Sequence, residues 1–240
     1  MGLLLGGFIL TGCAQWAAPS PQDKPPQVLR QLPLQFGAQD KSQWQAMRLP
    51  GKLLTAYRVA PQGPRDALLA EAASSASMLR QALHIHPDQL GALQFDWRVD
   101  QLIPGADMRQ RDAEDSPVRL IMVFEGDRQR FSAKNNMLSE LTLSLTGEPL
   151  PYATLMYVWC NDCPAESVIV NPRTDRIRKL AVESGADRVG QWLNYRRDIR
   201  ADFKKAFGEE PGALLGLALM TDTDNTRSTT RAWYGTIRLD

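Results

Sequence analysis

Residues 93–100, Leu-Gln-Phe-Asp-Trp-Arg-Val-Asp, alternate apolar and polar side chains without a break. This period of two is typical of a β-strand that buries one face and leaves the other polar. Residues 118–124, Val-Arg-Leu-Ile-Met-Val-Phe, form a nearly continuous apolar run that ends at a Glu-Gly-Asp turn, which predicts a second strand. Alternation of this kind favours antiparallel sheets that have one buried face and one solvent-exposed face.

Further strands and two helices are predicted around these two segments. Apolar runs bounded by turn residues predict strands over residues 53–59, 68–76, 152–159, 167–170, 176–182, 213–220 and 232–239. A helical stripe over residues 134–145 consists of Met137, Leu138, Leu141 and Leu145. A second helix over residues 194–207 has apolar side chains four apart, with Gly208 as its C-cap. We therefore expect a mainly β protein with two helices, an antiparallel β-sandwich of jelly-roll or lectin-like type.

Composition excludes one functional class. The 240 residues include 28 basic and 27 acidic side chains, and the formal net charge is +1. Lys and Arg are not clustered, as they must be to neutralise the phosphates of a nucleic acid, so no nucleic-acid partner is expected. Hydrophobic residues make up 43% of the chain, which is enough for the core of a folded domain.

The N-terminus has the pattern of an export signal. Residues 2–12 are apolar but too few to span a bilayer as a helix, which needs roughly 20 residues. They end in Leu-Thr-Gly followed by Cys13, which resembles the bacterial lipobox, although no basic residue precedes Leu3. The resemblance implies a signal peptide over residues 1–12 and acyl chains on Cys13 that anchor the protein in a lipid bilayer. Ala14 rather than Asp follows, which favours the outer membrane, facing the periplasm.

Other interpretations of this terminus are a plain secretory signal with an incidental cysteine, or a cytosolic protein with an apolar start. Residues 13–33 are rich in Pro, Ala, Gln and Ser, so they are expected to form an extended linker. No second linker follows, and residues 34–240 are predicted to form a single domain.

One candidate site is a run of oxygen-bearing side chains between two predicted strands. It consists of Asp222, Asp224, Asn225 and Thr226. Hard oxygen ligands at alternate positions suit Ca²⁺, and the same site could bind a glycan. A turn whose side chains hydrogen-bond their own backbone is the favoured interpretation of this run.

A second polar cluster consists of Asp112, Glu114, Asp115 and Arg119. Arg119 lies inside the apolar run, so its side chain either reaches solvent or pairs with a carboxylate. Paired acids could support glycosidase chemistry if their spacing in space allowed it. A solvated loop with one structural ion pair is the favoured interpretation.

Cys160 and Cys163 lie between two predicted strands and are expected to close a hairpin loop with a disulfide. A thioredoxin-like redox site would need a following helix, whereas a strand follows here. A zinc site would need further ligands, for which only His84 and His86 are available, and these are expected on a surface loop.

Several segments taken together resemble a known bacterial family, the domain of unknown function 3047. They are residues 95–102, 112–124, 150–159, 196–208, 217–226 and 232–239. The resemblance extends over about residues 53–240 and implies a secreted or periplasmic protein with a lectin-like β-sandwich. The family has no established activity.

The sequence predicts a lipid-anchored envelope protein that binds a glycan or a cation. It has no nucleophile elbow, phosphate-binding loop or metalloprotease motif, so an enzyme is not favoured. One alternative is a hydrolase of envelope carbohydrate whose acids come from Asp112, Glu114, Asp115, Asp198 and Asp222. Another is a structural or assembly lipoprotein.

Overall fold

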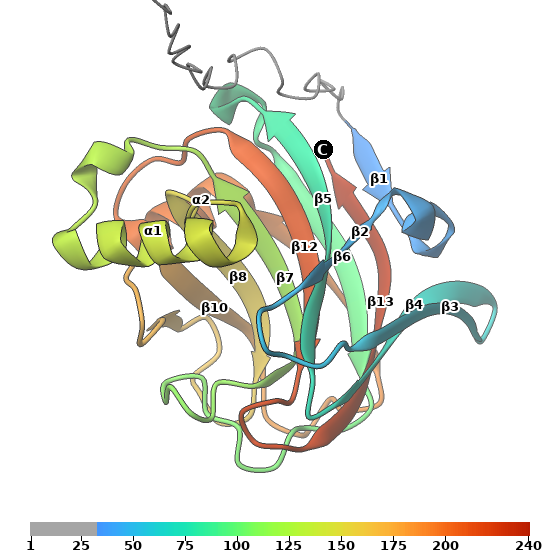
Figure 1. Ribbon diagram of the computed structural model, residues 1–240. Coiled ribbons are helices and arrows are strands. Elements are labelled where there is room, and N and C mark those ends of the chain that lie inside the picture. Colours follow the sequence, from blue (N-terminus) through green and yellow to red (C-terminus); the bar gives the residue numbers. More distant parts are fainter. Residues whose placement is uncertain (1–32) are drawn as a thin grey trace, which may run out of the picture.

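The alternating segments form the strands of two sheets that pack face to face (Figure 1). The structure is a computed structural model that describes residues 33–240. The six-stranded sheet has the order β11-β6-β13-β4-β3, with β1 also paired to β13. Its strands are β1 Leu34–Phe36, β3 Ala56–Gln62, β4 Arg65–Ala73, β6 Ala92–Val99, β11 Trp192–Asp198 and β13 Thr229–Leu239. The predicted β-sandwich is therefore confirmed.

The seven-stranded sheet has the order β2-β5-β12-β7-β8-β10-β9. Its strands are β2 Gln45–Arg48, β5 Ala76–Ile85, β7 Ser116–Phe124, β8 Ala153–Cys160, β9 Val168–Val170, β10 Ile177–Ser184 and β12 Leu214–Asp222. All strand pairs of the two sheets are antiparallel except β8 and β10, which run parallel. The prediction of antiparallel pairing thus holds for every described pair but this one.

The core lies between the sheets and is rich in aromatic rings. The apolar side chains of β6 face inward, as the alternation predicted. Phe95 of β6 stacks on Tyr157 of the opposite sheet, with 5.6 Å between ring centroids. Trp97, Tyr157 and Trp159 are fully buried, so these rings serve packing rather than an open stacking surface.

Two of the predicted strands have different limits in the structure. The predicted strand over residues 68–76 is two strands, because Ser74 adopts a left-handed backbone (φ 49°) between β4 and β5. The predicted strand over residues 53–59 starts later, at Ala56, and Leu53 makes only one isolated bridge, to Ser75.

Both predicted helices are present. Helix α1 spans Ala133–Thr146, and α2 spans Ile199–Phe207, with Gly208 as its left-handed C-cap. The prediction that the second helix starts at residue 194 is wrong, because residues 192–198 pair with β6 as strand β11. Three short 3₁₀ helices complete the described part: η1 Ala38–Gln43, η2 Pro87–Gln89 and η3 Arg128–Arg130. No helix within residues 33–240 is long and apolar enough to cross a membrane.

Helix α1 turns its apolar stripe outward. Met137 and Leu141 are 63% and 53% exposed, whereas Asn135 and Ser139 are buried. The polar face is held inward because Asn135 donates to Asp175 at 2.6 Å and Ser139 accepts from Arg128. These hydrogen bonds turn the polar face of α1 toward Asp175 and η3.

The expected signal peptide, the lipidated Cys13 and the Pro-rich linker lie outside the described residues, apart from position 33. The lipid anchor and the envelope location therefore stay predictions.

Candidate functional site

Three carboxylates converge where β12 ends and β7 begins. Asp115 precedes β7, Asp222 ends β12, and Asp224 lies in the following turn. The antiparallel register places Ser116 opposite Asp222, which brings the two segments together. One carboxylate oxygen from each of the three residues lies within 4.8 Å of the others. The structure thus joins the two polar clusters that the sequence presented separately.

Asp222 is half of a buried ion pair. Its two oxygens accept from Nε and Nη2 of Arg119, both at 2.8 Å, and Oδ1 also accepts from the backbone amide of Ser116. The two side chains are only 4% and 5% exposed. Burial raises the pKa of Asp222 above its usual value, and the Arg119 guanidinium opposes this rise. The expectation that a buried Arg119 pairs with a carboxylate is confirmed.

The other two carboxylates also have partners. Asp115 accepts from the backbone amides of Asn225 (3.2 Å) and Thr226 (2.7 Å) and from the Thr226 hydroxyl (2.6 Å), so it holds the turn after β12 in place. Asp224 pairs with Lys52. The cluster therefore offers oxygen ligands of the kind Ca²⁺ prefers, balanced by two basic side chains.

Glu114 belongs to a neighbouring buried group on the outer face of the seven-stranded sheet. Its carboxylate accepts from Nζ of Lys179 at 2.8 Å, from Asn171 at 2.9 Å, and pairs with Arg173. Lys179 also donates to the carbonyl of Met108 at 3.0 Å. Burial lowers the pKa of Lys179 to about 7. Glu114 is thus held in a buried network of ion pairs and hydrogen bonds.

The prediction of a solvated loop is wrong for Glu114 and Asp115, which are 8% and 1% exposed. It fails because the loop folds over β8 and β10 and packs Met108 against them. Asp112 is exposed, as the solvated loop predicted. Asp198 caps helix α2 by accepting from the amide of Ala201 at 3.0 Å.

The predicted disulfide between Cys160 and Cys163 is confirmed. Because their sulfurs are bonded to each other, these cysteines cannot act as zinc thiolates, and the zinc alternative is wrong. His84 lies in β5, not in the expected surface loop, because β5 extends to Ile85. His86 is exposed and accepts from the amide of Asp88 at the start of η2.

A polar depression of about 310 Å³ lies at the other end of β7. It is lined by Arg130, Ser132, Asn135, Tyr152, Asp175, Arg176, Arg178, Phe207 and Glu209. Glu209 accepts from Arg130 and from the Tyr152 hydroxyl, both at 2.9 Å. Arg176 lies over the Tyr152 ring at 4.7 Å and the Phe207 ring at 5.4 Å. The depression thus combines charged donors and acceptors with two aromatic rings.

The carboxylate cluster and the depression are far apart. β7 begins beside Asp222 and ends opposite Ala153, next to Tyr152. Nine residues of strand separate the two regions by roughly 25–30 Å. None of the sequence-predicted site residues lines the depression. No local signal marked it, because its residues come from four separate segments of the chain.

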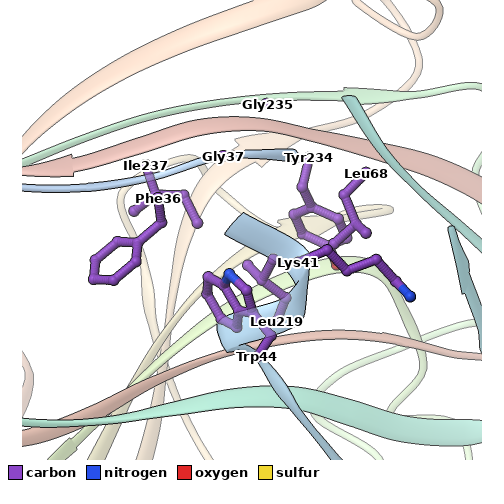
Figure 2. Close-up of a pocket in the computed structure, with 9 residues that line it drawn as sticks. All are labelled: Phe36, Gly37, Lys41, Trp44, Leu68, Leu219, Tyr234, Gly235 and Ile237. Carbon is purple, nitrogen blue, oxygen red and sulfur yellow. The ribbon is translucent and has the colours of Figure 1, made fainter. Parts of the chain in front are cut away.

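The second concavity is too small for a ligand. Figure 2 shows Trp44, Tyr234, Leu219 and Phe36 among the side chains gathered around it. Its interior holds about 10 Å³, close to the space of a single water molecule. It is a packing defect between residues 36–44 and the two sheets.

The fold and the buried site define a mainly β protein with two facing sheets and a charged network at one end. The sequence pattern of the family described as Protein of unknown function (DUF3047) matches residues 42–238, and the chain belongs to this family. No curated protein sequence matches the chain.

Solved structures with a similar outline include several carbohydrate-related domains. A family 11 carbohydrate-binding module of a Clostridium thermocellum cellulosomal cellulase is similar over 82% of this chain and 86% of its own, with TM-score 0.40 and 6% identity. A low affinity xylan binding module from Roseburia intestinalis is similar over 88% and 96%, with TM-score 0.33 and 11% identity. The xyloglucanase domain of NopAA from Sinorhizobium fredii is similar over 82% and 97%, with TM-score 0.39 and 8% identity. Similarity at this level carries no functional argument for this chain.

Proposed function

We propose that the chain is a lipid-anchored protein of the bacterial cell envelope that binds a glycan and catalyses no reaction on it. The observation that carries this proposal is the polar depression beside α1, β10 and α2. Sugars present many hydroxyl groups, each a donor and an acceptor, so their sites need convergent polar groups in a concave surface. Arg130, Arg176 and Glu209 provide such groups, beside the rings of Tyr152 and Phe207.

The acids that a hydrolase would use support binding over catalysis. A glycosidase needs two carboxyl groups facing each other across an open cleft, one of them able to hold a proton. The candidates Glu114 and Asp222 are buried in ion pairs, and Asp115 and Asp198 hold backbone amides. Neither these four nor Asp112 lines the depression, and the two carboxylates that do line it are engaged: Asp175 accepts from Asn135, and Glu209 accepts from Arg130 and Tyr152.

Affinity electrophoresis of the whole chain through gels that contain soluble polysaccharides tests the proposal. We expect at least one polysaccharide to retard the chain and Tyr152→Ala to reduce the retardation. Arg58→Ala is the matched control, because Arg58 forms an exposed pair with Glu71 on the other sheet. Unchanged mobility in every polysaccharide, neutral or acidic, would contradict glycan binding.

The lipid anchor requires a separate experiment. Cys13→Ser removes the thiol that accepts the lipid, so the variant is expected to leave the membrane fraction or to remain unprocessed. Unchanged fractionation and processing would refute the anchor without affecting the proposal about glycans.

A structural calcium ion is the second candidate function, favoured by the convergence of the Asp115, Asp222 and Asp224 carboxylates within 4.8 Å. If the cluster binds Ca²⁺, adding the ion should raise the melting temperature and EDTA should reverse the rise. Asp224→Asn should abolish this response, whereas the distant Asp175→Asn should retain it. A melting temperature that is insensitive to Ca²⁺ would exclude the site.

A further inference from the structure

Arg176 is a largely buried cation whose hydrogen bonds are incomplete. Its side chain is 13% exposed, and its one ion pair within residues 33–240 is a contact of 3.5 Å from Nη1 to Glu209. Its Nε is buried and has no hydrogen-bond partner in this part of the chain. A buried polar group without a partner is costly, and each such group needs a physical explanation. Because Nε itself is inaccessible, an acceptor that enters the depression would bond to the part of the Arg176 guanidinium that lines it.

The charges around Arg176 point to an acidic acceptor. Three guanidinium groups, of Arg130, Arg176 and Arg178, line the depression with only two carboxylates, of Asp175 and Glu209. Glu209 is already shared by Arg130 and the Tyr152 hydroxyl.

The carboxylate of Asp175 also has a hydrogen-bond partner within the chain. It accepts from Asn135 at 2.6 Å, and this hydrogen bond lowers the pKa of Asp175. Nε of Arg178 donates to the backbone carbonyl of Asp175 at 2.9 Å. The two terminal nitrogens of Arg178 are therefore left for solvent or a ligand. The depression therefore has one positive charge more than its own carboxylates balance.

We propose that the depression binds a sugar residue that carries a carboxylate, a hexuronate unit of an acidic glycan. This inference rests on the proposed glycan-binding function and specifies its ligand. The planar fork of an arginine matches a carboxylate in two parallel hydrogen bonds, which Arg176 and Arg178 are placed to donate. A volume of about 310 Å³ is at the small end of ligand sites, so it suits one sugar residue rather than a long chain.

Calorimetric titration of the whole chain with oligogalacturonate, with its neutral galactose counterpart and with inorganic phosphate tests the proposal. We expect oligogalacturonate to bind about tenfold or more tightly than the neutral sugar, because hydrogen bonds to a charged group are worth about 1.5–3 kcal/mol. Its affinity should fall as salt is added.

Two variants localise the site. Arg176→Gln should abolish the preference for the acidic sugar. Because Arg176 is largely buried, Arg178→Gln serves as a second variant that is half-exposed and makes no ion pair within the described residues. It should weaken oligogalacturonate binding while the melting temperature stays unchanged, and Arg58→Gln should alter neither.

The outcomes separate the inference from the proposed function. Equal affinity for acidic and neutral sugars overturns the hexuronate but leaves glycan binding intact. Binding of phosphate without oligogalacturonate overturns the sugar and leaves only an anion site. Absence of binding to either sugar overturns the hexuronate, and glycan binding is then decided by the electrophoresis with the other polysaccharides.

Discussion

Replacing Arg119 by Met leaves Asp222 as a buried carboxylate with no counter-ion. Both side chains are about 95% buried, and both guanidinium bonds to the carboxylate are 2.8 Å long. Removing one partner of such a pair costs about 3–5 kcal/mol, because the remaining charge stays out of water. For a chain of this size, that corresponds to a fall in melting temperature of roughly 6–20 °C.

The pH dependence of this loss has a definite sign. Burial raises the pKa of Asp222, and without the guanidinium it rises further. The carboxyl of an unfolded chain titrates at about 3.9, so above that pH the unfolded variant releases a proton that the folded variant keeps. Stability therefore falls as pH rises from about 4 through the folded-state pKa. The free energy of unfolding of Arg119→Met should be closest to that of wild type in acid and furthest below it at neutral pH.

Urea unfolding of wild type and variants at several pH values measures these differences. The double variant Arg119→Met with Asp222→Asn should regain much of the loss, because neither member of the pair is then charged and the amide oxygen can still accept from Ser116. Arg58→Met, which breaks an exposed pair, should cost at most about 1 kcal/mol. If Arg119→Met costs no more than Arg58→Met, the buried pair is not the stabilising contact described.

Three further predictions concern other parts of the molecule. Mass spectrometry of the unreduced protein should show the peptide with Cys160 and Cys163 two hydrogens lighter than after reduction; an identical mass would exclude the disulfide. Leu141→Gln should change the free energy of unfolding by about 0.5 kcal/mol or less, because Leu141 is 53% exposed, and a larger loss would show that α1 is covered in solution. Gly126→Ala should weaken glycan binding, because its Cβ would meet the Tyr152 ring at 2.0 Å; full affinity in a calorimetric titration would exclude Tyr152 from the site.

The strands were predictable because each carries its own pattern. Residues 93–100 alternate strictly, and the structure buries their apolar side in the core. Strand β11 was missed because residues 194–198 are polar and lie at the edge of a sheet, where pairing with β6 rather than an apolar pattern makes the strand. The β-propensity of its residues alone does not determine whether such a segment forms a strand.

Only the part of the carboxylate cluster that is contiguous in the sequence could be predicted. Asp222, Asp224 and Asn225 are neighbours in the sequence, and their turn was recognised from composition. Asp115 joins them through the pairing of β7 with β12, which no short motif encodes. The depression could not be predicted, because Tyr152, Arg176 and their neighbours meet only after the seven-stranded sheet, α1 and α2 have assembled.

Strand β1 consists of three residues, Leu34–Phe36, that pair with the last residues of β13 (Figure 1). Any tension transmitted along the chain from the residues before it reaches the sandwich first through this short pairing. Because β1 is joined to β13 alone among the described strands, it can peel away one ladder bond at a time while the other pairs stay closed. Detachment would expose Phe36, which is 1% exposed in the intact fold. If the chain is tethered at Cys13, β1 is therefore the first element that yields to mechanical load, and the load then passes to β2, which pairs with β5.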